Sequence, residues 1–175
     1  MVESHEQWRP IAGCEGLYSV SDRGRVRSER RIVMRSNGVP QRINERILRQ
    51  QTEEKGHKAV HIRVDGVRVV LKVHQLVLEA FVGPRPPGMV ACHYDDDKEN
   101  NQVSNLRWAT YSDNMSDQIR NGTHYQLNKT HCPLGHPYND ANTLVYTRPG
   151  GRPDRRCRTC LRARAKKYRA SKRAA

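Results

Sequence analysis

Residues 90–114, VACHYDDDKENNQVSNLRWATYSDN, decide the fold of this chain. A short apolar run opens the stretch, the polar residues 95–102 follow, and a second apolar run occupies residues 106–109. This pattern predicts two strands joined by a polar loop. Thr110, with Asp113 three positions later, forms the pattern of a capping box and predicts that a helix begins directly after the second strand.

A strand–loop–strand–helix unit would bring three polar side chains toward one another, namely His93, Asn105 and Asn114. They provide a base, an amide and an oxygen ligand, which is the set that metal-assisted hydrolysis of a phosphodiester requires. A single buried histidine is usually structural, so the prediction depends on all three residues occurring together.

The spacing of these residues resembles that of a known family. His93, then Asn105 within SNLRW, then Asn114 within SDN, is similar to the ββα-metal core of the HNH endonucleases of phages and group I introns, in which Asn replaces the last His. The resemblance covers residues 72–124. It implies that His93 is the general base, that Asn105 orients its imidazole, and that Asn114 binds a divalent ion, Mg²⁺ or Mn²⁺.

One position departs from that family. The residue before the general base is often a metal-binding Asp or Asn, and here it is Cys92. A thiolate is a soft ligand and a poor match for Mg²⁺. Either Cys92 accompanies a softer metal at the catalytic site, or a carboxylate takes its place. The candidates for that carboxylate are Asp95, Asp96, Asp97 and Asp117.

The positive charge is concentrated near the end of the chain. The 175 residues carry a net charge of +14, and residues 148–175 hold twelve Arg or Lys against the single acid Asp154, a local charge of +11. Such a block predicts binding to a polyanion such as the phosphate backbone of nucleic acid. The alternative is a solvated tail that only aids solubility.

Cysteine and histidine spacing in the same region predicts a second metal site. Cys132-x₃-His136 and Cys157-x₂-Cys160 supply four ligands, which close a tetrahedral zinc site and leave no open position, so we expect a structural role. The helix predicted after Cys160 has no apolar stripe, and it would bind nucleic acid through Arg162, Arg164, Lys166, Lys167 and Arg169.

We therefore expect an α+β protein in three parts. Residues 6–56 would form a small β-rich module with a linker, residues 57–124 the ββα nuclease core, and residues 131–175 the zinc-binding module that ends in a basic helix. The segment at residues 6–28 resembles a modular element that precedes HNH cores and is thought to assist DNA binding. Residues 29–56 are polar and read as the linker.

The resemblance implies a metal-dependent endonuclease that hydrolyses double-stranded DNA. The alternatives are a catalytically decayed, zinc-containing DNA-binding protein, for which Cys92 would be the sign, and a binder of structured RNA. No apolar run is long enough to cross a bilayer, and the first residues lack a signal core, so we expect a cytoplasmic protein, as for a phage-encoded protein in its host. The oligomeric state stays open, with a dimer as one option.

Overall fold

The computed structural model describes residues 5–151 and 153–173. They fall into two compact units, Met1–Asp117 and Gln118–Ala175, each described by itself below. The strands of the described part are β1 (Trp8–Pro10), β2 (Tyr18–Ser21), β3 (Val26–Ser28), β4 (Arg31–Met34), β5 (Pro40–Ile43), β6 (Arg46–Ile47), β7 (Gln51–Thr52), β8 (Lys58–Val64), β9 (Val67–Lys72), β10 (Val90–His93), β11 (Leu106–Ala109), β12 (Thr143–Thr147) and β13 (Pro153–Cys157). The helices are α1 (Val73–Phe81), α2 (Tyr111–Arg120) and α3 (Arg158–Arg173).

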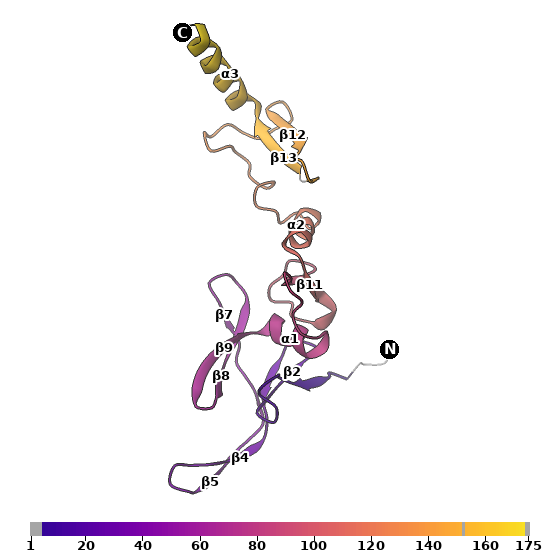
Figure 1. Ribbon diagram of the computed structural model, residues 1–175, viewed down its shortest axis with the longest axis vertical. Coiled ribbons are helices and arrows are strands. Elements are labelled where there is room, and N and C mark those ends of the chain that lie inside the picture. Colours follow the sequence, from indigo (N-terminus) through magenta and orange to yellow (C-terminus); the bar gives the residue numbers. More distant parts are fainter. Residues whose placement is uncertain (1–4, 152, 174–175) are drawn as a thin grey trace. The chain divides into compact units, whose positions relative to one another are not determined.

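Small antiparallel sheets make up the first unit. One sheet has the strand order β1-β2-β3-β6, a second has the order β7-β8-β9, and β4 pairs with β5 in a hairpin that extends away from both (Figure 1). The pair β10–β11 forms a further two-stranded sheet. Short strands of this kind bury little surface individually, so their stability depends on a core that they share.

The β8–β9 hairpin follows directly from its sequence. Apolar residues recur at every second position on β8, from Val60 to Val64, and on β9, from Val67 to Leu71, and the pairing runs from Ala59 opposite Lys72 to Val64 opposite Val67. At the turn, Asp65 has a φ of 49° and Gly66 a φ of 80°. Two successive residues with positive φ form the turn that matches the twist of a two-stranded hairpin, and Asp-Gly adopts it readily.

A single hydrophobic core joins the N-terminal strands to the region that follows them. Val20 and Val26 from β2 and β3 lie in one buried cluster with Ile62 of β8, Val77 of α1 and Leu106 of β11. Val20, Val26 and Val77 have no exposed surface. Burial of side chains of this size contributes about 1.5–3 kcal/mol each, so residues 6–56 and the ββα unit stabilise one another.

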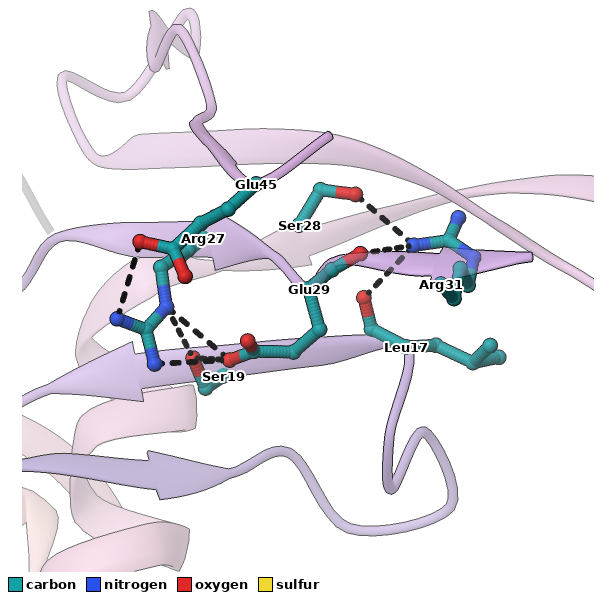
Figure 2. A network of polar contacts seen from close by, with 7 residues as sticks. All are labelled: Leu17, Ser19, Arg27, Ser28, Glu29, Arg31 and Glu45. Carbon is teal, nitrogen blue, oxygen red and sulfur yellow. Dashed lines mark hydrogen bonds and ion pairs between the residues drawn. The ribbon is translucent and has the colours of Figure 1, made fainter. Parts of the chain in front are cut away.

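A polar network links the two central strands of the first sheet, β2 and β3, to the residues that follow them (Figure 2). The carboxylate of Glu29 accepts hydrogen bonds from the hydroxyl of Ser19 and from Nε of Arg27, the latter at 3.1 Å. The guanidinium of Arg31 donates to the carbonyl oxygens of Leu17 and Glu29 and to Ser28. These bonds tie β2 and β3 to the start of β4.

Part of the predicted linker is in fact regular structure. Within residues 29–56, β4 and β5 pair around Gly38, β6 adds to the first sheet beside β3, and β7 pairs with β8. These strands are largely exposed, and even the apolar residues Ile32 and Met34 of β4 are 73% and 67% exposed. Neither β4 nor β5 alternates apolar and polar residues, so the pattern that marks a half-buried strand is missing from both.

The second unit contains β12, β13 and α3. The two strands pair antiparallel from Thr143 opposite Cys157 to Thr147 opposite Pro153, and α3 begins directly after β13. Gly150 and Gly151, both with positive φ, lie in the connection between the strands. No helix in the described ranges combines the length and apolar character needed to span a bilayer.

Candidate functional site

The predicted strand–loop–strand–helix unit is present. β10 pairs with β11 from Val90 opposite Ala109 to His93 opposite Leu106, and α2 follows at once. Thr110 and Asp113 form the capping box: the backbone N–H of Asp113 donates to the Thr110 hydroxyl oxygen at 3.2 Å, and the backbone N–H of Thr110 donates to the Asp113 carboxylate at 3.0 Å. Both hydrogen bonds fix the direction in which α2 leaves the strand pair.

Asp95 organises the loop between the two strands. Its carboxylate accepts hydrogen bonds from the side chains of Asn100 at 2.7 Å and Asn105 at 2.8 Å, and from the backbone N–H of Asp97 at 2.8 Å. Desolvation opposes ionisation, but the hydrogen bonds from Asn100 and Asn105 outweigh it and lower the pKa of Asp95. The loop is thus held around a carboxylate that stays charged.

Asn101, rather than Asn105, contacts the imidazole of His93. His93 is 5% exposed, and its Nε2 lies 3.1 Å from Oδ1 of Asn101, which is 4% exposed. The side chain of Asn105 instead bonds to Asp95 and to the carbonyl oxygen of Asn100. The prediction that the side chain of Asn105 bonds to His93 is therefore wrong, because the Asn105 amide bonds to Asp95 and Asn100 and closes the loop.

Sequence reasoning did not single out Asn101. It lies in a run of polar loop residues, and only its register relative to His93 distinguishes it from its neighbour Asn100. The order of strand pairing and the path of the loop determine that register, and neither is readable from residue types.

Two further histidines lie beside His93. The ring centroid of His74 lies 5.2 Å from that of His93, and the centroid of His57 lies 4.8 Å from that of His74 and 6.0 Å from that of His93. Burial, together with the neighbouring His93 and His57, lowers the pKa of His74 to about 3, and burial and Lys98 lower the pKa of His57. Both rings are therefore neutral near pH 7, and His57 is a neighbour of the site that sequence reasoning missed.

The residues predicted to bind the catalytic ion differ in their suitability. Asn114 lies in the first turn of α2 and is half-buried. Cys92 is 2% exposed, and its Sγ lies 3.7 Å from the carbonyl oxygen of Val90. Burial raises the pKa of the Cys92 thiol to about 11, although Arg107 acts in the opposite direction. Cys92 is thus a protonated thiol at neutral pH.

Asp117 does not provide a free carboxylate in place of Cys92. It is 2% exposed and forms an ion pair with Arg107, whose guanidinium also stacks 4.5 Å from the ring centroid of Tyr94. Of the two residues predicted to bind the ion directly, Asn114 and Cys92, only Asn114 offers a hard oxygen ligand, and phosphate oxygens of a substrate would add to the coordination. The residues present fit such an ion through Asn114 and not through Cys92.

The second unit brings the four predicted zinc ligands together. One ligand atom each from Cys132, His136, Cys157 and Cys160 lies within 4.8 Å of the others. Sγ of Cys132 lies 3.6 Å from Sγ of Cys160 and 3.4 Å from Nδ1 of His136. Ligands around a tetrahedral zinc ion are separated by roughly 3.5–3.8 Å, so the spacing of these atoms fits a candidate Cys/His metal site.

Hydrogen bonds around the Cys157 sulfur favour its thiolate. Its Sγ accepts hydrogen bonds from the side-chain amide of Asn142 at 3.3 Å and from the backbone N–H of Cys160 at 3.5 Å. Desolvation raises the pKa of Cys157, but these donors outweigh it and lower the pKa to about 6. Desolvation and the neighbouring thiols raise the pKa of Cys160 to about 12. Ionising every thiol of this cluster therefore requires a cation among them.

The last helix is exposed and rich in basic residues. All residues at 162–173 of α3 are exposed, including the five predicted to bind nucleic acid. Arg162, Lys166, Arg169 and Arg173 line one shallow groove along the helix together with two alanines. Small side chains between basic ones leave room for a polyanion to approach the helix.

Comparison with known proteins finds two families that this chain resembles in separate regions. Residues 71–116 match the HNH endonuclease family, and residues 6–63 match the NUMOD4 motif. The chain thus contains a region similar to HNH endonucleases, with a region that matches the NUMOD4 motif ahead of it. The resemblance inferred from the sequence, and the α+β fold with its ββα core, are confirmed.

Particular relatives come from viruses. The chain is 31% identical over 117 residues to the DNA endonuclease I-HmuI of Bacillus phage SP01, covering 67% of this chain and 60% of that protein. It is 26% identical over 116 residues to an uncharacterised HNH endonuclease of Acanthamoeba polyphaga mimivirus, covering 66% of this chain and 31% of that protein. The matches therefore span less than two thirds of these relatives.

A solved structure supports the same relationship. The structure of I-HmuI, an HNH homing endonuclease that binds and cleaves DNA, matches this chain with a TM-score of 0.54 and 25% sequence identity. The match covers 91% of this chain and 82% of that one.

Proposed function

We propose that this chain is an endonuclease that hydrolyses phosphodiester bonds of double-stranded DNA, with His93 as its general base. The observation that carries the proposal is the buried imidazole of His93, held at the end of β10 by a polar loop, within the region that matches the HNH family. I-HmuI, a relative over much of the chain, is a DNA endonuclease.

In the proposed reaction, the imidazole of His93 accepts a proton from the attacking water, and a neutral histidine suits this role near pH 7. Asn105 would support His93 indirectly, because its side chain bonds to Asp95 and to the carbonyl oxygen of Asn100 and so keeps the loop closed. Asn114 offers its amide oxygen to Mg²⁺ or Mn²⁺. When bound, such an ion polarises the scissile phosphate and stabilises the leaving oxygen.

The Cys/His site and the basic helix α3 would stabilise the fold and bind DNA, respectively. We infer that the Cys/His site holds Zn²⁺ in a structural role, because four protein ligands leave no position for a substrate. The basic residues of α3 would contact phosphates of the DNA backbone, which provide affinity with little reading of sequence. The predicted divisions at residues 6–56, 57–124 and 131–175 remain the functional parts that we propose.

Nicking of supercoiled plasmid tests the proposal. The wild-type chain should convert plasmid to the open-circular form with Mg²⁺ or Mn²⁺, and His93→Ala should not. His61→Ala is the matched control, because it removes an imidazole that bonds to Gln51 on the β7–β8–β9 sheet. A wild-type chain that binds duplex DNA but never nicks it would favour the alternative of a catalytically decayed DNA-binding protein. Tighter binding to structured RNA than to duplex DNA at equal salt would favour the alternative of an RNA-binding protein.

A further inference from the structure

The amide of Asn101 has a defined orientation. Its Nδ2 donates to two backbone carbonyl oxygens, that of Lys98 at 3.3 Å and that of Glu99 at 3.1 Å. Two acceptors on one side of the amide place the nitrogen there, so Oδ1 must face His93. The assignment of oxygen and nitrogen in this side chain therefore follows from its hydrogen bonds.

This orientation determines which nitrogen of His93 carries the hydrogen. Oδ1 of Asn101 accepts only, so Nε2 of His93, 3.1 Å away, must be the donor. In the neutral ring, Nδ1 then holds the lone pair. The ring is 5% exposed, and no described residue forms a hydrogen bond with its Nδ1. Nδ1 is thus the ring nitrogen that can accept a hydrogen bond, and later a proton, from a water molecule.

A turn of the N-terminal module holds Asn101 from its other side. A Cβ added to Gly24 would lie 2.6 Å from Cβ of Asn101 and 2.8 Å from its carbonyl oxygen, so only glycine fits there. The backbone N–H of Val103 donates to the carbonyl oxygen of Asp22 at 2.8 Å, and the side chain of Gln50 donates to the carbonyl oxygen of Gly24 at 2.6 Å. The turn and the loop are therefore in tight contact.

We propose that Asn101 is the positioning residue that fixes the tautomer and direction of the His93 imidazole, and that the Asp22–Gly24 turn of the NUMOD4 region holds Asn101 in place. This inference rests on the proposed function of His93. It gives the N-terminal module a second role besides any contact with DNA, because displacement of its turn would be transmitted through Asn101 to the general base.

Nitrogen-15 NMR of the full-length chain tests the assignment without reference to catalysis. In the wild type, His93 should show a hydrogen on Nε2 that exchanges slowly with solvent, and an unprotonated Nδ1. Asn101→Leu, of similar volume but without the amide, should lose the slowly exchanging signal. Asn101→Asp keeps an acceptor oxygen and should retain it. A hydrogen on Nδ1 in the wild type, or an unchanged signal in Asn101→Leu, would overturn the proposal.

Gly24→Ala tests the contribution of the turn. It should weaken the Nε2 signal although Asn101 itself is intact. Gly16→Ala is the matched control, because Gly16 also has a positive φ of 73° but has nothing within 4 Å of an added Cβ. Equal effects of the two substitutions on the His93 signal would show that the turn does not hold Asn101.

Single-turnover nicking then separates positioning from folding. Asn101→Leu should lower the rate constant at saturating DNA on the order of 10- to 100-fold while DNA affinity changes less than about threefold. Gln102→Ala, a change of the exposed neighbouring amide, should leave both quantities unchanged. If His93→Ala nicks as fast as the wild type, the proposed function fails whatever the NMR shows. If His93→Ala is inactive but Asn101→Leu nicks normally, only the positioning role fails.

Discussion

Replacement of Cys92 with aspartate should raise the Mg²⁺-supported rate of DNA nicking by about tenfold or more. The wild-type thiol is buried and has a pKa of about 11. At pH 8 about one thiol in a thousand is then ionised, and forming the thiolate costs about 4 kcal/mol. An aspartate with an ordinary pKa of about 3.9 is already ionised at this pH, and its oxygen is a hard ligand.

The full 4 kcal/mol is not expected to appear in the rate. Burial raises the pKa of a carboxylate, and the nearby Asp117 raises it further, whereas Arg107 lowers it. A gain of about tenfold corresponds to roughly 1.4 kcal/mol, or about one third of the cost of ionising the thiol. The gain should be larger with Mg²⁺ than with Mn²⁺, because Mg²⁺ has the stronger preference for oxygen.

The assay is nicking of supercoiled plasmid over a series of Mg²⁺ and Mn²⁺ concentrations. Cys92→Asn is the matched control, because it has the size of aspartate without its charge, and thermal unfolding of each variant shows whether the buried site accepts the new side chain. If Cys92→Asp is folded and binds DNA, yet has the metal dependence of Cys92→Asn, position 92 does not contact the catalytic ion.

Three further predictions concern the rest of the chain. Removal of Zn²⁺ by a chelator should unfold the second unit and leave the near-UV circular dichroism of Trp8 and Trp108 unchanged. Because protons compete with the metal for the thiolates, the chelator should act faster as the pH falls toward the Cys157 pKa of about 6. Glu29→Gln should lower the free energy of unfolding of the first unit by about 1–2 kcal/mol in urea titrations, since the charged acceptor for Ser19 and Arg27 is lost; an equal effect of the exposed control Glu45→Gln would contradict this. Neutralising two basic residues of α3 should reduce the slope of log affinity for duplex DNA against log salt by up to about 2, and an unchanged slope would show that the helix does not contact phosphates.

Much of the site was predictable because it depends on local signals. The alternation of residues 57–73 with Asp65-Gly66 at the turn, the apolar face of α1, and the capping box at Thr110 each encode an element directly. The Cys/His site was equally predictable, since its ligands come in two short, closely spaced pairs and His136 is the histidine that joins them.

The features that were missed depend on contacts between distant segments. β4 and β5 are largely exposed strands in which apolar and polar residues do not alternate, so their pairing was invisible in the sequence. The partner of the His93 imidazole is Asn101, because Asp95 closes the loop and the backbone of Gly24, a residue far away in the chain, packs against Asn101. Residue types alone could not show which of several asparagines would reach the ring.

Chemical rescue of His93→Ala is the most direct test of the role assigned to this imidazole. Single-turnover nicking by the variant should be slower than that of the wild type by roughly 100- to 10,000-fold, and added free imidazole should restore part of the rate as its neutral form accumulates. Nicking by His93→Ala at the wild-type rate, with or without added imidazole, would contradict the account.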